Sequence, residues 1–338
     1  MFRILLTAAT ACLTLAPGAP GAGAEPFRLI VTHLETPLAP NSVLDLALQE
    51  GYFARAGVEV ELIRVQQTPS ALAALRSGAG EMANVGTDAL IRMAAQGADL
   101  KAVDSPNKSL PFLIAARREI ATLADLAGGS FGVGRLGSVD HGQSLKVLEA
   151  QGLDPETLQV VSLGQPGVRA QALMAGAVDA TTMSIGVLTT LPDRTGIHVL
   201  VDPETYYAAA PVVSKLDVVR GDVLRARAAE VSAVVEALVL ASRAYAADPA
   251  AWVAAMEKAR PDVARADLEA LAAAYAGSWS VNGGLSAKEL RYTSDWLHES
   301  EDFATTPKLE IGDWVDFSVL DGVLARLGVV EGADEPTR

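Results

Sequence analysis

One unit occurs twice in this sequence, and it constrains the fold more than any other feature. The segment ALAALRSGAGEMANVG (71–86) is followed by RAQALMAGAVDATTMS (169–184), at a constant offset of 98 positions. Both copies read as the end of a helix, a glycine break (Gly78 and Gly176) and a short strand. Alanine-rich helices can match by chance, but in both copies an acidic residue also follows the glycine three positions later. We therefore interpret the copies as equivalent parts of two similar lobes.

A longer pattern precedes each copy. Residues 27–65 and 131–164 both read as strand, polar loop, helix, glycine break and strand. Each half therefore reads β-α-β-α-β. This alternation predicts an α/β fold with two lobes, each a mainly parallel sheet flanked by helices, in which the carboxyl ends of the strands form the ligand face.

Two polar or proline-containing segments read as crossings between the lobes, VDSPNKSLP (103–111) and VDPETYYAAAP (201–211). The second lobe is then inserted into the first. We expect lobe I at 25–104 plus 210–338 and lobe II at 105–209. The apolar spacing of the chain from 221 to 327 predicts helices, which we expect to pack on lobe I.

Residues 1–24 resemble a cleaved secretory signal peptide, with basic Arg3, an apolar stretch, helix-breaking prolines and the small-residue site Ala22-Gly23-Ala24. The apolar stretch is too short to span a bilayer. A lipid anchor on Cys12 is the alternative, but the residues before it match that pattern poorly. We expect an exported, periplasmic protein.

Composition excludes several function classes. Cys12 is the only cysteine, so cleavage after residue 24 leaves no disulfide, thiolate metal site or cysteine nucleophile. The formal net charge is −14, which disfavours binding to nucleic acid and to anionic membranes. Half of the residues are hydrophobic, enough to build a sizeable core.

The order and spacing of several segments resemble a known family. They are LALQEGYFARAGVEVEL, the repeated unit, LADLAGGSFGVGRLGS, LEAQGLDP and WSVNGGLSAKELRYTSDWL, and the similarity runs from Phe27 to Gly328. The family comprises periplasmic substrate-binding proteins of ABC importers. Its branch serves nitrate, thiamine-pyrimidine precursors and sulfonates such as taurine. The resemblance implies a monomer that closes on a small solute, like a Venus flytrap, and delivers it to a membrane permease powered by an ATPase subunit.

Six predicted turns lead from a strand into a helix N-terminus, which can hold a carboxylate or sulfonate. The sharpest difference between the repeats is Arg169, which stands where the first copy has Ala71. A guanidinium there could clamp an oxyanion through two hydrogen bonds. The candidate ligand-binding residues are Thr36, Asn41, Thr68, Ser70, Gly86, Thr87, Ser138, His141, Gln165, Arg169, Ser184 and Tyr207.

Structural roles are open for many of these residues. Thr68 and Ser70 could cap a helix, and Arg169 could be a solvated surface residue. Ser138 is a helix-capping candidate and, by the resemblance, also a ligand-contacting serine. A neutral His141 could bind a ligand, whereas Tyr207 could belong to the packing between the lobes.

Catalytic signatures are weak. Residues 132–137 spell G-x-G-x-x-G, but the first glycines fall inside a predicted strand, and no ribose-binding acid follows. An HExxH motif is absent from the sequence, and we expect no cofactor, no metal and no enzyme activity. The enzyme alternative is a pyrimidine-synthase-like protein, which would need His141 with Lys108 or Lys146.

The sequence and this resemblance together predict the solute-binding component of an ABC importer that captures a sulfonate or carboxylate, aromatic ones included, between two lobes. The alternative ligands are nitrate and a pyrimidine-type thiamine precursor. For the pyrimidine, Glu35, Asp88 or Asp140 would matter more than Arg169. A sensor that docks on a membrane receptor is a further alternative.

Overall fold

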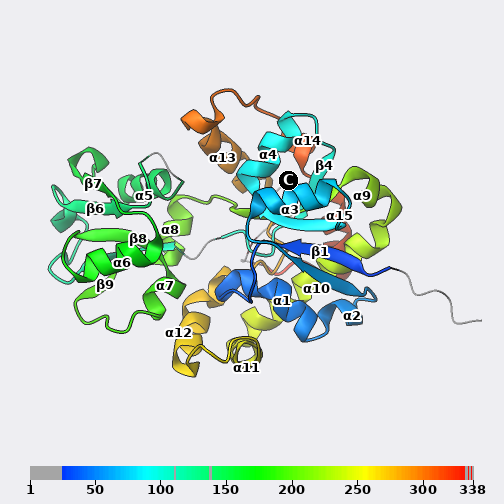
Figure 1. The fold of residues 1–338 in the computed structure, drawn as a ribbon, viewed down its shortest axis with the longest axis horizontal. Coiled ribbons are helices and arrows are strands. Elements are labelled where there is room, and N and C mark those ends of the chain that lie inside the picture. The colour runs from blue at the N-terminus through cyan, green and yellow to red at the C-terminus, as the bar shows by residue number, and fades with distance from the viewer. Residues whose placement is uncertain (1–24, 110–111, 137–138, 332–333, 335, 337–338) are drawn as a thin grey trace, which may run out of the picture.

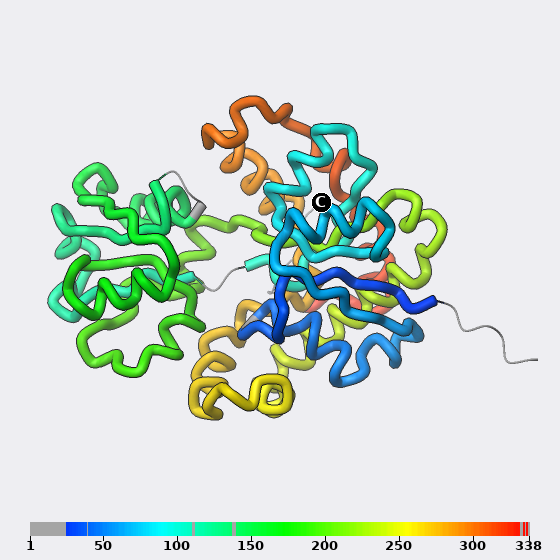
Figure 2. The backbone as a smooth tube through the Cα atoms, in the orientation of Figure 1, coloured from blue at the N-terminus to red at the C-terminus, as the bar shows by residue number. Residues whose placement is uncertain are grey.

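The computed structural model describes residues 25–109, 112–136, 139–331, 334 and 336. They form two lobes side by side, each built on a five-stranded sheet (Figure 1). The chain builds four strands of one lobe, crosses to the other, and returns for its C-terminal third (Figure 2). The expected signal peptide (1–24) lies outside the described residues.

The sheet of lobe I has the strand order β2-β1-β3-β10-β4. Strands β1, β2 and β3 are parallel, whereas β10 is antiparallel to both of its neighbours. The strands are β1 (Phe27–Val31), β2 (Val60–Arg64), β3 (Met82–Gly86), β4 (Leu100–Asp104) and β10 (Lys215–Arg220).

The sheet of lobe II repeats this arrangement in the order β7-β6-β8-β5-β9. Here β5 is the antiparallel strand, between β8 and β9. The strands are β5 (Phe112–Arg117), β6 (Ser130–Val133), β7 (Gln159–Ser162), β8 (Ala180–Ser184) and β9 (Ile197–Val201).

The internal repeat coincides with this symmetry. β3 and β8 occupy equivalent places, and their bounds differ by 98 positions, the predicted offset. Gly78 and Gly176 both have positive φ, 79° and 71°, a backbone conformation that glycine adopts without strain. The acid after each glycine binds the start of the neighbouring central strand: Glu81 accepts from the backbone N–H of Arg28, and Asp179 from that of Ser130.

The expectation of mainly parallel sheets is confirmed, with one antiparallel strand in each sheet. These strands, β5 and β10, are the ones that the chain enters directly after a crossing. Each arrives from the opposite lobe and therefore runs against its neighbours. Strands β5 to β9, which form the sheet of lobe II, lie between the two crossings, and the other described strands lie outside them. We therefore propose lobe boundaries at 25–104 plus 210–338 and at 105–209.

Helices cover both sheets, and several begin where proline occupies the first turn, as in α3, α6, α8 and α11. In lobe I they are α1 (Ser42–Gln49), α2 (Tyr52–Arg55), α3 (Thr68–Arg76), α4 (Thr87–Ala95), α9 (Gly221–Ala226), α10 (Ala228–Ala247), α11 (Pro249–Ala259), α12 (Arg265–Tyr275), α13 (Ala287–His298), α14 (Ile311–Trp314) and α15 (Ser318–Leu327). Lobe II carries α5 (Val139–Ala150), α6 (Pro166–Met174), α7 (Ile185–Thr189) and α8 (Pro203–Ala209). Short 3₁₀ turns lie at Ala39–Asn41, Ala124–Leu126, Pro155–Thr157, Ala276–Ser278 and Glu301–Phe303.

The C-terminal helices pack on lobe I, as the apolar spacing predicts. Helix α10 packs against α1, α2 and α15, and the indole N–H of Trp252 in α11 donates to Ser42 in α1. Helix α12 also touches α7 of lobe II. The C-terminal third therefore builds part of the interface between the lobes.

The two crossings run beside each other. The backbone N–H of Ser214 on the second donates to the carbonyl of Lys108 on the first. Thr87 in lobe I donates through its hydroxyl to the Val213 carbonyl (2.6 Å) and through its backbone N–H to the Ser214 carbonyl. The start of α4 thereby holds the second crossing in place.

In the part of the chain that the structure describes, no helix has the length and apolar character needed to cross a membrane.

Candidate functional site

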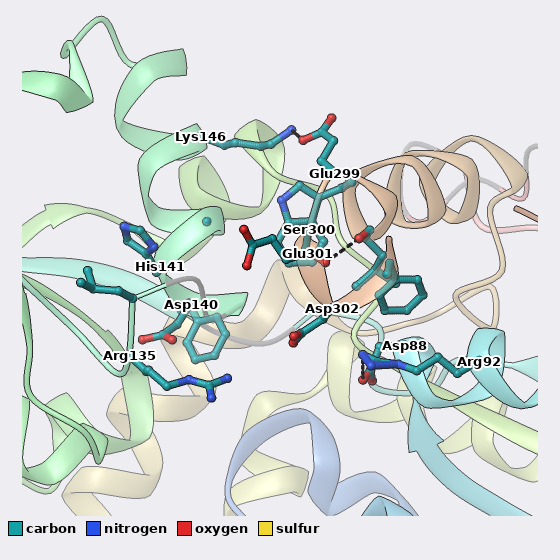
Figure 3. Close-up of a pocket in the computed structure, with 16 residues that line it drawn as sticks. Asp88, Arg92, Arg135, Asp140, His141, Lys146, Glu299, Ser300, Glu301 and Asp302 are labelled. Carbon is teal, nitrogen blue, oxygen red and sulfur yellow. Dashed lines mark hydrogen bonds and ion pairs between the residues drawn. The ribbon is translucent and has the colours of Figure 1, made fainter. Parts of the chain in front are cut away.

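A cavity of about 890 Å³ opens between the two lobes. One wall comes from the loop after β6 and the start of α5 in lobe II, and the other from α4, the end of α13 and the turn after it (Figure 3). The lining residues are Asp88, Arg92, Phe112, Arg135, Leu136, Asp140, His141, Gly142, Lys146, Trp296, Leu297, Glu299, Ser300, Glu301, Asp302 and Phe303.

Charged side chains of both signs face this cavity. The guanidinium of Arg135 extends from lobe II toward the wall that carries Asp302 and Asp88 (Figure 3). Asp88 pairs with Arg92 at 3.2 Å within α4. The aromatic rings of Phe112, Trp296 and Phe303 supply apolar surface beside these charges. The cavity thus offers both charged groups and apolar surface to a small molecule.

Arg169 does not line this cavity. It is 4% exposed, and its Nη1 lies 3.2 Å from Asp140. Its guanidinium also donates to the backbone carbonyls of Thr182 and Gly164. Arg169, which stands where the first repeat has Ala71, therefore forms a buried ion pair with Asp140 inside lobe II. The clamp role stays a prediction, and Arg169 would have to leave these acceptors to perform it.

The G-x-G-x-x-G segment has a structural role in its described part. Gly132 lies within β6, as expected, and the backbone N–H of Gly134 donates to Asp140 at 2.8 Å. A Cβ atom on Gly134 would approach Arg169 and Asp140 to about 3.0 and 3.1 Å. Gly134 thus allows the loop after β6 to approach the ion pair of Arg169 and Asp140 closely. The third glycine of the motif, Gly137, lies outside the described residues.

The predicted residues of lobe I lie at the carboxyl ends of its strands, and most of their polar groups have protein partners. The Thr68 hydroxyl accepts from the N–H of Gly86 at 3.2 Å, and Thr36 donates to Asp45. Ser70 is exposed. The hydroxyl of Thr87 donates its hydrogen bond to the carbonyl of Val213, beside the second crossing.

Among the predicted residues of lobe II that the structure describes, only His141 lines the interlobe cavity. Gln165 is exposed at the N-terminus of α6, and the Ser184 hydroxyl accepts from the N–H of Val187 and so caps α7. Ser138 lies outside the described residues.

Tyr207 belongs to a second cavity, of about 600 Å³, beside the crossings. The ammonium of Lys108 lies 5.5 Å from the centre of the Tyr207 ring and also pairs with Glu289 and Asp334. Lys108 is therefore neutralised by two carboxylates.

A buried polar cluster in lobe I escaped the sequence analysis. Asp104 on β4 and Asp217 on β10 face each other in register, and both side chains are fully buried. Asn84 donates to Asp217 at 2.8 Å and exchanges hydrogen bonds with Asn107 on the first crossing, which in turn donates to Asn41. No periodicity marks this cluster, because its members come from three strands and two loops.

Burial favours the protonated form of the two carboxyl groups in this cluster. Among the described residues, neither oxygen of Asp104 has a hydrogen-bond donor, and neither has Oδ2 of Asp217. Burial and the neighbouring charge of Asp217 raise the pKa of Asp104 well above its usual range, and burial also raises the pKa of Asp217. One shared proton removes the repulsion between the two groups.

No group of side chains suited to hold a metal ion occurs among the described residues.

Comparisons with known proteins agree with this architecture. The family model described as "NMT1/THI5 like" matches residues 43–251. A comparison with curated protein sequences gives no match.

Solved structures match nearly the whole chain. The periplasmic sulfonate-binding protein SsuA of a putative sulfonate ABC transporter from Methylobacillus flagellatus KT has a TM-score of 0.70 at 16% identity, covering 90% of this chain and 95% of that chain. The periplasmic aliphatic sulphonate binding protein SsuA from Escherichia coli has 0.66 at 18% identity, covering 86% and 97%. The desulfurization enzyme DSZB has 0.60 at 16% identity, covering 89% and 99%. These likenesses show the periplasmic-binding-protein fold.

Proposed function

The chain belongs to the NMT1/THI5-like family, and we propose that it is the periplasmic solute-binding component of an ABC importer, capturing a small organic anion between its lobes. The observation that carries this proposal is the cavity of about 890 Å³ whose walls come from both lobes. Two lobes joined by two adjacent crossings can rotate toward each other and enclose a solute in such a cavity.

The ligand class follows from the groups at the cleft. Helix N-termini of both lobes lie at the carboxyl ends of the strands, and Arg135 and His141 line the cavity with aromatic surface beside them. Two similar structures are those of sulfonate-binding proteins. We infer a sulfonate or carboxylate with an apolar part. We keep the twelve predicted residues as candidate contacts and add Arg135.

The partners and location follow from the same proposal. Residues 1–24 would direct export and be removed, and a permease with its ATPase would receive the solute from the binding protein. Anchoring through Cys12 remains the alternative.

A thermal-shift and calorimetric screen of the protein from residue 25 onward tests the proposal. The compounds are aliphatic and aromatic sulfonates, carboxylates, nitrate and pyrimidines. A compound at 100 times its dissociation constant stabilises the folded state by about 2.7 kcal/mol, which a melting curve resolves. Binding of a sulfonate or carboxylate supports the proposal. Binding of a pyrimidine alone would replace it and would direct attention to Asp88 and Asp140, which line the same cavity.

Catalysis is a second candidate because His141 and Lys146 line one cavity and because a desulfurization enzyme shares the fold. The Lys146 ammonium is paired with Glu299 at 2.7 Å, whereas a nucleophile needs a free amine. Mass spectrometry of each bound compound after prolonged incubation separates the two functions. A binding protein returns the compound unchanged, whereas an enzyme releases a product.

A further inference from the structure

Lys215 is the first residue of β10 and directly follows the second crossing. Its backbone pairs with Gly86 at the end of β3, and its ammonium donates to the hydroxyl of Thr32 at 2.7 Å. Thr32 follows β1, and β3 lies between β1 and β10 in the sheet. The Lys215 side chain therefore passes across the carboxyl end of β3.

This end of the sheet faces lobe II. The β1 arrow points from the chain's N-terminal side toward lobe II (Figure 1). Lys215, Thr32 and Gly86 are each partly exposed there, next to the turn that leads into α4 and to Asp88 of the cavity wall. The ammonium of Lys215 thus lies at the end of the lobe I sheet that faces lobe II, beside the predicted contacts Gly86 and Thr87. Lys215 is not among the residues that line the cavity of about 890 Å³, whose wall includes Asp88, two positions after Gly86.

The hydrogen-bonding of Lys215 is incomplete. An ammonium has three donors, and among the described residues its acceptor is the single neutral hydroxyl of Thr32. Burial lowers the pKa of Lys215, and the charge of Asp217 opposes this shift without forming an ion pair. Four other cations at the cleft or buried nearby do have a carboxylate: Arg92 with Asp88, Lys108 with Glu289, Lys146 with Glu299, and Arg169 with Asp140.

We propose that Lys215 is the charge partner of the bound anion on lobe I, donating to a carboxylate or sulfonate oxygen with the N–H groups that Thr32 does not use. This inference rests on the proposed function and names the residue that selects an anion over its neutral analogue. A desolvated ammonium with unused donors favours an anion, because a neutral amide offers the same shape without the charge. Arg135 would approach the same solute from lobe II.

The test measures dissociation constants by calorimetry for straight-chain alkanesulfonates and alkanecarboxylates of one to eight carbons, each paired with its neutral amide. Lys215→Met keeps an unbranched side chain that is one heavy atom shorter, and it removes the charge. We expect at least tenfold weaker binding of the anions, with less than a twofold change for any amide that binds. Lys215→Arg should keep more anion affinity than Lys215→Met.

Lys101→Met is the matched control, because Lys101 lies near the other end of the same sheet and donates to the carbonyls of Gly312 and Asp313. It changes the net charge equally and should leave anion binding unchanged. Lys215→Gln provides a second neutral variant if Lys215→Met does not fold.

The outcomes separate the two proposals. If the wild-type protein binds no member of the anion series or of the wider screen, the proposed function is wrong. If the wild type binds an anion and Lys215→Met or Lys215→Gln binds it equally well, the assignment of Lys215 is wrong while the proposed function stands.

Discussion

The ammonium of Lys146 lies 2.7 Å from the carboxylate of Glu299, and this ion pair joins the two lobes across the cavity. Lys146 belongs to α5 of lobe II, whereas Glu299 directly follows α13 of lobe I. Beside it, Gly142 of α5 lies against Trp296 of α13, so that a Cβ atom on the glycine would be 3.6 Å from the indole. The pair therefore stabilises this arrangement of the lobes.

We predict that Glu299→Lys shifts the lobes away from this arrangement and that Lys146→Glu combined with Glu299→Lys restores it. The side chains are 34% and 61% exposed, so the coupling energy should stay below about 1 kcal/mol and vanish in high salt. Interlobe distances from paired fluorescent labels, measured at low and high ionic strength, check this. A salt-independent effect would show that the charges are not its cause.

Arg169→Ala should destabilise lobe II before it affects ligand binding. The substitution leaves Asp140 and two backbone carbonyls without their guanidinium, and breaking such a contact costs about 3 kcal/mol. Chemical denaturation gives the loss of unfolding free energy, and calorimetry gives the affinity. Arg194→Ala, in the same lobe, is the control. A tenfold loss of affinity at unchanged stability would instead support a clamp on the ligand.

The pair of Asp104 and Asp217 makes stability fall as pH rises. Their pKa values are raised in the folded state, whereas an unfolded aspartate titrates near about 3.9. From about pH 4 upward the folded protein therefore holds more protons than the unfolded chain. While the folded protein holds one proton more than the unfolded chain, the unfolding free energy falls by about 1.4 kcal/mol for each unit that the pH rises. The decrease ends where the pair itself loses its proton.

Asp104→Asn tests this pH dependence. The carboxamide keeps the shape of the side chain and can donate to Asp217, so the decline should shrink and the variant should be more stable than the wild type above pH 7. Denaturant titrations from pH 4.5 to 8.5 measure both slopes, with Asp88→Asn as the exposed control. Equal slopes in wild type and Asp104→Asn would mean that the pair does not hold the proton.

Asp179→Ala should lower stability by about 2 kcal/mol, because the carboxylate accepts from both the N–H and the hydroxyl of Ser130 at 2.8 and 2.7 Å. These hydrogen bonds lower the pKa of Asp179. Its contribution is therefore complete above the unfolded value of about 3.9 and is lost as pH falls through the lowered folded pKa. Thermal unfolding at pH 7 and pH 2.5 measures the difference. Glu149→Ala, at an exposed position of the same lobe, is the control, and a similar loss there would contradict the assignment.

The architecture was predictable because its evidence lies in local sequence. Gly78 and Gly176 mark the same backbone turn, and the offset of 98 places β3 and β8 at equivalent positions. The direction of β5 and β10 was not predictable in this way, because a strand's direction depends on the side from which the chain enters the sheet.

The candidate site was only partly predictable. Residues that follow a strand, such as Thr68, Gly86 and His141, could be identified from their turns. Their hydrogen-bond partners could not, because Thr87 bonds to Val213, 126 positions away. Lys215 could not be identified from the sequence for the same reason, because without its partners it is an ordinary lysine at the start of a strand.

The sequence by itself determined the two-lobed fold, since helix and strand periodicity and glycine breaks act over a few residues. Only the tertiary structure decided which charged side chains remain available to bind a ligand. Arg169, the most conspicuous cation in the repeat, is held by Asp140, whereas Lys215 reaches a neutral hydroxyl across the end of a neighbouring strand. The physical reason is that burial and ion pairing depend on groups brought together by the fold, from positions that are far apart along the chain.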